Sequence, residues 1–257
     1  MTIINRRQED ILKELDQKGY VNVVDLCELF NVSTVTIRKD LNFLENEKLL
    51  HRTHGGASKK PIYAFERDVS DKETLQVEQK KQIAKEALNY ISEHDYIILG
   101  SGSNIHYLSR IITGFQKLTV LTPSLKVSLE LSKEINIDTI QLGGDVRNSS
   151  TSAVGPIAEA TLSQFSCNKL FLGTDGVHLE FGLSTSNALE AHLNQAMIEV
   201  AEKVIVLADS TKMNIRGFGK ICNLNKIDVL ITDEGIDPET KMKLEEIGID
   251  VVIAGKL

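Results

Sequence analysis

The chain has 257 residues, of which 42% are hydrophobic, and this is enough for a sizeable core in one or two domains. It contains no run of about 18 apolar residues and no charged-then-apolar leader, so we expect a cytoplasmic protein without a membrane span. A formal net charge of −7 argues against nucleic-acid binding over the whole surface, and leaves room only for a local basic patch.

The three cysteines, Cys27, Cys167 and Cys222, are odd in number and far apart in the sequence. This pattern indicates free thiols in a reducing compartment rather than a disulfide framework. The six histidines show no ligand spacing either. We therefore expect no metal site and no cofactor.

The first two predicted elements are short helices. Apolar side chains recur on one side of residues 6–18, and Gly19 follows in the position of a C-terminal cap. Residues 24–30 carry a second apolar stripe, and Asn31 tolerates the left-handed backbone of a tight turn. This spacing predicts the first half of a helix-turn-helix motif.

A third helix is expected to read DNA. Ser33 is a suitable N-cap for it, and three apolar residues at i, i+4 and i+7, starting at Ile37, predict a buried stripe. The opposite face is then free for base edges and phosphates in a major groove. The candidate DNA-binding residues of this segment are Ser33, Thr34, Thr36, Arg38 and Lys39.

A basic wing is expected after the third helix. Residues 49–53 have the pattern of a strand and the glycine pair after it that of a bend, which places Arg52 and His54 against the DNA backbone or minor groove. Residues 31–60 hold six Lys or Arg against three Asp or Glu, a local positive patch. Because this patch is small, we expect a homo-oligomer, a dimer or tetramer, that binds repeated half-sites.

Residues 3–58 resemble the N-terminal domain of the DeoR family of bacterial transcriptional regulators. The resemblance rests on Val-Ser-x-x-Thr-Ile-Arg-Lys-Asp-Leu at residues 32–41 and on His-Gly-Gly-Ala at residues 54–57. Without it, the pattern also fits a small amphipathic helical domain whose Arg38 and Lys39 are merely solvated. The resemblance implies a winged helix-turn-helix that binds a double-stranded DNA operator.

The pattern changes after residue 58. Residues 59–74 lack apolar periodicity and carry a charged run, and they are expected to be a linker. Residues 75–257 alternate short apolar runs with helical patterns, which predicts an α/β domain with a mostly parallel, Rossmann-like sheet covered on both faces. The expected strands are residues 96–99, 118–122, 137–142, 169–172, 204–208, 227–232 and 251–254.

Polar residues follow five of these strands, at the edge where a parallel sheet keeps its ligand site. Strand 96–99 runs into a Gly-Ser-Gly-Ser-Asn turn that opens a helix, and backbone N–H groups of such a turn can hold a phosphate. Hydroxyls, paired glycines, an Asp and a Lys follow other strands. The candidate effector-binding residues at these turns are Gly102, Ser103, Asn104, Thr122, Ser124, Gly143, Gly144, Asp175 and Lys212.

Residues 75–233 resemble the effector domain of the same family, which is similar in fold to ribose-5-phosphate isomerase and coenzyme A transferases. The resemblance rests on the first two turns and on five further motifs: Leu-Gly-Gly-Asp-Val-Arg at residues 142–147, Val-Gly-Pro at residues 154–156, Leu-Gly-Thr-Asp-Gly-Val at residues 172–177, Gly-Leu-Ser-Thr at residues 182–185 with Glu190, and Ala-Asp-Ser-Thr-Lys at residues 208–212. It implies a repressor of a carbohydrate-metabolism operon, released from DNA by a phosphorylated sugar or related metabolite. By resemblance the phosphate would lie against Gly102, Ser103, Asn104, Ser124 and Lys212, and sugar hydroxyls against Asp175 and Glu190.

The chain departs from the family pattern at two turns. Gly100 and Asn104 replace an Asp and a Thr that members commonly have, and Pro123 replaces an Asn, so the identity of the effector does not carry over. The alternative is an isomerase-like enzyme with an attached DNA-binding domain, in which Glu190 and Lys212 act as base and oxyanion donor.

We expect no catalysis. The isomerases carry a further Lys before a Gly-rich run after their Asp-Gly motif, and residues 180–184 are Glu-Phe-Gly-Leu-Ser here. A third hypothesis, an architectural DNA binder without an effector, predicts a featureless second domain, which the polar strand ends do not favour.

Overall fold

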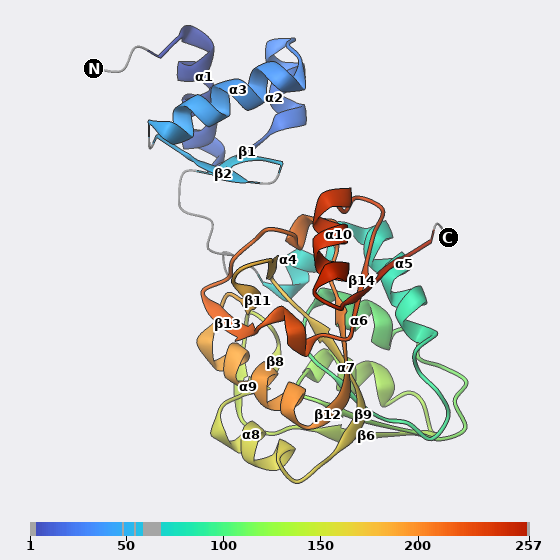
Figure 1. Ribbon diagram of the computed structural model, residues 1–257. Helices are drawn as coiled ribbons and strands as arrows, with labels where there is room; N and C mark the ends of the chain where they lie inside the picture. The colour runs from blue at the N-terminus through green and yellow to red at the C-terminus, as the bar shows by residue number, and fades with distance from the viewer. Residues whose placement is uncertain (1–3, 48, 54, 59–67, 256–257) are drawn as a thin grey trace. The chain divides into compact units, whose positions relative to one another are not determined.

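The computed structural model describes residues 4–47, 49–53, 55–58 and 68–255. The chain divides into two compact units, residues 1–63 and 64–257. The first unit is a winged helix-turn-helix (Figure 1). Its elements are α1 (Arg6–Lys18), β1 (Tyr20–Asn22), α2 (Val23–Phe30), α3 (Thr34–Asn46), β2 (His51–Thr53) and β3 (Gly56–Ser58).

Short polar side chains and left-handed residues set the ends of the three helices. Asn5 caps α1, and Gly19 and Asn31 end α1 and α2 with φ angles of 71° and 49°. Ser33 Oγ accepts a hydrogen bond from the backbone N–H of Thr36 at 3.3 Å and so caps α3. The sequence predictions for these helices and for the turn are confirmed.

A buried ion pair joins α1 to α3. Asp40 is 5% exposed, and its carboxylate accepts hydrogen bonds from Arg7 Nε at 2.6 Å and Gln8 Nε2 at 3.0 Å. The apolar stripe expected on α3 is fully buried beside it. Because the same face of α3 is committed to this core, the opposite face is left to solvent.

The wing is a three-stranded antiparallel sheet in the order β1-β3-β2. The sequence predicted the strand and the bend but not β1, and His54 lies outside the described residues. A Cβ added to Gly56 would lie 1.8 Å from the carbonyl oxygen of Val21 in β1, whereas one added to Gly55 would meet nothing closer than the Tyr20 hydroxyl at 3.8 Å. Only glycine fits at residue 56 without moving β1.

We expect Gly56→Ala to destabilise the first unit by about 1–3 kcal/mol, because the new methyl group forces the wing strands apart. The measurement is the free energy of unfolding from hydrogen exchange at the amides of α1 and α3 in the full chain. Gly55→Ala is the matched control and should change the free energy by no more than about 0.5 kcal/mol. Equal losses in the two variants would contradict the packing role of Gly56.

The second unit is a three-layer α/β structure. Its elements are α4 (Val69–Glu73), α5 (Val77–Leu88), β4 (Tyr96–Leu99), α6 (Ser103–Ser109), β5 (Leu118–Thr122), α7 (Leu125–Leu131), β6 (Ile137–Gln141), β7 (Asp145–Arg147), β8 (Ser152–Val154), α8 (Pro156–Leu162), β9 (Cys167–Gly173), β10 (Gly176–His178), β11 (Gly182–Thr185), α9 (Ala188–Glu199), β12 (Ala201–Leu207), η1 (Ser210–Lys212), β13 (Gly219–Cys222), η2 (Leu224–Lys226), β14 (Val229–Thr232), α10 (Pro238–Glu246) and β15 (Asp250–Ile253).

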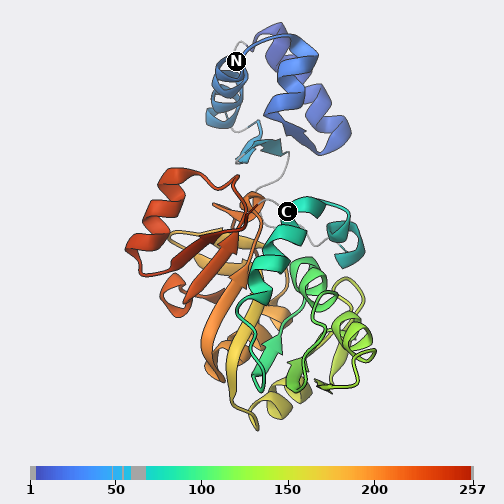
Figure 2. The ribbon, with the colours of Figure 1, turned by 90° about the vertical axis from the view of Figure 1, so that its right-hand side faces the viewer.

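Seven parallel strands form the central sheet, in the order β15-β14-β12-β9-β4-β5-β6. Alternate residues of a strand enter opposite core layers, as Ile97 and Ile98 do in β4. Helices α5, α6 and α7 cover one face, and α8, α9 and α10 cover the other. Figure 2 shows the teal and green helices of the first group on one side of the sheet and the red α10 on the other. The predicted parallel sheet with two covered faces is confirmed.

Three features of the second unit were not predicted. A small antiparallel sheet, β10-β11-β13, packs in the same layer as α9, and β7 and β8 form a hairpin. Residues 68–74, expected to belong to a linker, instead contain the helix α4, whose Val69 is buried. The folded structure of this unit therefore includes residues before residue 75.

Two expectations from composition can be compared with the structure. Cys27, Cys167 and Cys222 are free, and burial raises the pKa of the Cys167 and Cys222 thiols to about 11. Within the described ranges, no helix combines the length and the apolar character that a membrane span requires.

Candidate functional site

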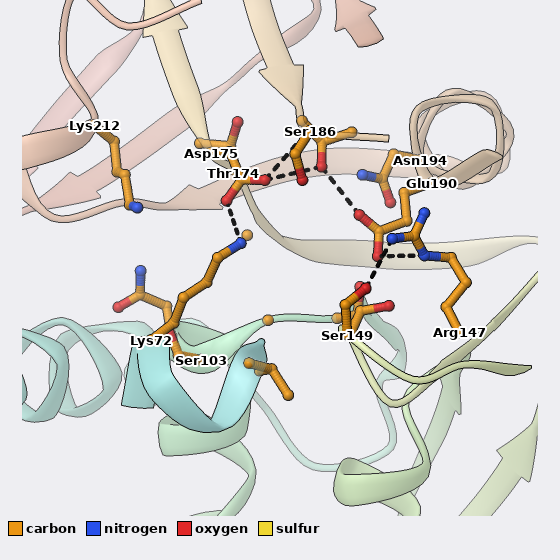
Figure 3. Close-up of a pocket in the computed structure, with 17 residues that line it drawn as sticks. Lys72, Ser103, Arg147, Ser149, Thr174, Asp175, Ser186, Glu190, Asn194 and Lys212 are labelled. Carbon is orange, nitrogen blue, oxygen red and sulfur yellow. Dashed lines mark hydrogen bonds and ion pairs between the residues drawn. The ribbon is translucent and has the colours of Figure 1, made fainter. Parts of the chain in front are cut away.

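A polar pocket lies at the carboxyl ends of β4, β9 and β12, which are neighbours in the sheet. Strands β5 and β6 follow β4 towards one edge of the sheet, and the later strands β9 and β12 lie between β4 and the opposite edge. The pocket therefore lies where the strand order reverses. Figure 3 shows the side chains that converge there. The lining residues are Val69, Lys72, Ser101, Gly102, Ser103, Asn104, Arg147, Ser149, Ser150, Gly173, Thr174, Asp175, Thr185, Ser186, Glu190, Asn194 and Lys212.

A chain of alternating charges crosses this pocket (Figure 3). Lys72 Nζ lies 2.6 Å from Asp175 Oδ1, and the Thr185 hydroxyl lies 3.2 Å from Asp175 Oδ2 and 3.1 Å from Glu190 Oε2. Arg147 Nε is 3.7 Å from Glu190 Oε1 on the far side. Each of the two carboxylates therefore has its own cation, with a hydroxyl between them.

The Asp175 carboxylate is stabilised in its ionised form. Burial raises the pKa of Asp175, but the charges of Lys72 and Lys212 and the hydrogen bonds from Lys72 and the Ser186 N–H outweigh burial and lower the pKa below its ordinary value. Asp175 is accordingly negative at neutral pH and forms an ion pair with Lys72 in the pocket wall.

Other lining groups are left with hydrogen-bonding capacity. The ammonium group of Lys212, among the described residues, has neither a hydrogen-bond nor an ion-pair partner within range, and its half-buried side chain reaches the pocket. Asn104 donates from Nδ2 to the Leu207 carbonyl at 3.2 Å, while its buried Oδ1 has no partner among the described residues. Gly102 precedes α6 with a φ of 109° and no side-chain cap. Donors and an acceptor thus face the same space.

The motif at residues 209–212 explains how Lys212 is held. Asp209 is 2% exposed and caps η1 by accepting from the N–H of Thr211 at 3.2 Å. Ser210 donates from its N–H and its hydroxyl to Asp233, at 2.7 and 2.8 Å. These bonds fix the turn after β12, so that the following Lys212 faces the pocket.

Helix α4 supplies one wall of the pocket and is bound on its other side by charged groups. Glu73 Oε1 accepts from Lys126 Nζ at 2.7 Å and from His106 Nδ1 at 2.8 Å, which ties α4 to α7 and α6. Burial raises the pKa of Glu73, but these hydrogen bonds outweigh burial and lower the pKa. Lys72 and Glu73, consecutive in sequence, therefore anchor α4 to two different parts of the unit.

A buried lysine closes the end of α4. Lys80 is 3% exposed, and its ammonium group donates to the carbonyl oxygens of Lys72, at 2.6 Å, and of Leu75. Burial lowers the pKa of Lys80. At the other end, the N–H of Val69 donates to the Ser149 carbonyl at 2.6 Å, beside the pocket. The helix is held at both ends.

Six of the expected effector residues line this pocket: Gly102, Ser103, Asn104, Asp175, Glu190 and Lys212. The other four lie outside it. Thr122 is fully buried and accepts from the N–H of Ser124, which itself caps α7. Gly143 and Gly144 lead into the β7–β8 hairpin, and a Cβ on Gly144 would lie 2.5 Å from the Val154 carbonyl oxygen. The hairpin, bridged to residue 124 through residue 152, occupies the ends of β5 and β6.

Sequence reasoning missed two cations of the pocket. Arg147 lies in a recognised motif, yet only the fold shows that β7 turns its side chain toward Glu190. Lys72 lies in a five-residue helix, which is too short to show apolar periodicity. Among the described residues, no cluster of His, Cys, Asp and Glu has the make-up of a metal site.

The expected DNA-binding residues of the first unit lie mostly on the exposed side of α3. Ser33, Thr34, Arg38 and Lys39 are exposed and Thr36 is half-buried. Arg52 is half-buried in the wing, and its backbone N–H donates to Glu45 at 2.8 Å. Burial and the positive charge of nearby Arg38 lower the pKa of the Arg52 guanidinium group, and the negative charge of Glu45 acts against this shift.

The first unit is a winged helix-turn-helix with an exposed cationic helix, and the second is an α/β unit with a polar pocket. This combination of domains is typical of a ligand-responsive transcriptional regulator. The chain belongs to the DeoR family of such regulators. Residues 7–60 match the DeoR-like helix-turn-helix domain, and residues 75–234 match the DeoR C terminal sensor domain.

Relatives match over nearly the whole chain. A protein of Escherichia coli O157:H7 named for repression of the aga operon is 37% identical, over 100% of this chain and 96% of its own length. The lactose phosphotransferase system repressor of Staphylococcus epidermidis is 32% identical, over 93% and 95%. The solved structure of ribose 5 phosphate isomerase A from Neisseria gonorrhoeae covers 55% of each chain with a TM-score of 0.39 and 19% identity, a likeness too weak to carry an argument about activity.

Proposed function

We propose that this regulator represses a carbohydrate-metabolism operon in the cytoplasm and leaves its operator when a phosphorylated sugar binds the pocket of the second unit. The names of the two relatives, a repressor of the aga operon and a repressor of the lactose phosphotransferase system, support a sugar operon. The observation that carries the proposal is Lys212, an ammonium group without an ion-pair partner among the described residues, beside the glycine turn at residues 101–103.

The composition of the pocket suits a polyhydroxylated anion. Lys212 and the turn before α6 offer donors for a phosphate, and hydroxyls, amides and two ion-paired carboxylates line the remaining wall. Among the lining residues that the structure describes, none has an aromatic side chain on which a nucleobase would stack. A sugar phosphate has both the charge and the hydroxyls that these groups would pair with.

We infer that the pocket binds its ligand without converting it. An isomerase requires a carboxylate that can take a proton next to a carbonyl group. Glu190, the candidate base, is instead engaged by Arg147 and by the Thr185 hydroxyl. Both oxygens of this carboxylate thus face groups of the protein, Oε1 towards Arg147 and Oε2 towards Thr185, which supports a sensor rather than an enzyme.

Helix α4 is proposed to transmit ligand binding. It follows residues 59–67, which connect it to the DNA-binding unit, and it presents Lys72 to Asp175 in the pocket. A phosphate at Lys212 would bring further negative charge within reach of Lys72. Lys72 would then be shared between two acceptors, and the position of α4 would change with it.

We also propose a homo-oligomer, a dimer or a tetramer, because one small basic patch gives modest affinity and repeated half-sites multiply it. Sedimentation of the full chain at micromolar concentration should show a dimer or a tetramer. A monomer as the single species would contradict this proposal.

The exposed cations of α3 are proposed to contact DNA. Alanine at Arg38 and Lys39 together should weaken binding to an operator selected from a randomised duplex pool by about 1–3 kcal/mol, and should reduce the salt dependence of binding. Fluorescence anisotropy at several salt concentrations measures both quantities. The control is Lys13→Ala with Lys18→Ala, which removes two exposed cations of α1. Unchanged affinity of the α3 variant would overturn the assignment.

The two pocket lysines should have separable effects on release from the operator. Calorimetry with pentose and hexose phosphates, each beside its unphosphorylated parent, should find binding that requires the phosphate group. Lys212→Ala should raise the ligand concentration needed for release but still allow complete release. Lys72→Gln should remain on the operator even when calorimetry shows the pocket to be saturated.

Lys243→Ala, an exposed lysine of α10 paired with Glu239, is the matched control and should behave like the unaltered protein. The ligand should also be recovered unchanged after incubation. If no compound of the panel binds in a phosphate-dependent way, the sensor proposal fails. If Lys72→Gln leaves the operator completely when its pocket is saturated with ligand, only the proposed role of α4 fails.

A further inference from the structure

The most exposed part of α3 has an apolar side chain at its centre. A helix turns about 100° per residue, so the side opposite the buried residues Ile37, Asp40, Leu41 and Leu44 is centred on residue 35. Val35 is 60% exposed there, in the first helical turn after the Ser33 cap.

Two exposed cations, Arg38 and Lys39, lie on the same side of α3 as Val35. A cationic surround does not suit an apolar protein partner, because the charged groups would lose water on contact. It does suit DNA, because the phosphates that border a major groove take up the cations while the centre of the helix faces the bases. The placement of Val35 therefore favours a base over a protein surface.

Among the groups that bases present in the major groove, the C5 methyl group of thymine is the apolar one. A valine side chain is short and stiff, so it makes such a contact with little loss of conformational freedom. We propose that Val35 reads the methyl group of one thymine in the operator, an inference that rests on the proposed role of α3 in DNA binding.

Replacement of thymine by uracil tests the inference, because uracil lacks the methyl group and keeps the pairing. The probe is a duplex selected by the full chain from a randomised pool, in which each thymine is replaced singly by uracil. We expect one position at which uracil weakens binding by about fourfold, the effect of one methyl group leaving a buried contact. Val35→Ala should bind the thymine duplex about fourfold more weakly and should not distinguish thymine from uracil at that position.

Val24→Ala is the matched control. Val24 is a valine of similar exposure, 56%, on α2 of the same unit, and its variant should keep the preference for thymine. Alanine favours helices more than valine does, so Val35→Ala should fold, which thermal unfolding confirms independently.

Three results would overturn the inference. The first is a protein that shows no thymine preference at any position, and the second is a preference that persists unchanged in Val35→Ala. The third is a Val35→Ala variant that loses affinity equally for thymine and uracil duplexes. If the variant lacking Arg38 and Lys39 also binds with unchanged affinity, the whole α3 surface fails as the DNA contact; otherwise the failure concerns Val35 alone.

Discussion

The burial of both faces of the seven-stranded sheet is the constraint on which the second unit depends. Apolar side chains of each strand enter two separate core layers, so a charged group cannot be placed within the strands without a partner. The polar groups of the pocket lie beyond the carboxyl ends of the strands, where β4, β9 and β12 bring residues from three distant segments together. The pocket arises there, and its carboxylates are paired with cations, as Asp175 is with Lys72, whereas Lys212 has no ion-pair partner among the described residues.

Much of the fold could be predicted because its signals are local. Capping residues such as Ser33 and short apolar runs mark the helices and parallel strands in the sequence itself. Six of ten expected effector residues line the pocket for the same reason, since a turn after a parallel strand must lie at one edge of the sheet. The DNA-binding and effector roles of these residues stay predictions.

The remainder could not be predicted because it depends on contacts between segments distant in sequence. Nothing near Thr122 shows that the β7–β8 hairpin will occupy the end of its strand. Nothing in the charged run before residue 75 marks Lys72 as a pocket residue, because its role is created by Asp175, 103 residues later. Val35 was missed for another reason: the helical spacing places it on the free face of α3, but only the polar and charged residues of that face were considered as DNA contacts.

Helix α4 has five residues, fewer than an isolated helix needs in water. Its helical form must then be maintained by its anchors at Asp175, His106, Lys126 and Lys80. Five residues span about 7.5 Å as a helix and about 16.5 Å when extended, so melting of α4 would lengthen the tether between the two units by about 9 Å. In the proposed oligomer, half-sites on a duplex would be separated by about 34 Å per helical turn, and a change of this size would alter which spacings the DNA-binding units can reach. The anchors of α4 would thereby set a geometric limit on the operators that such an oligomer can bind.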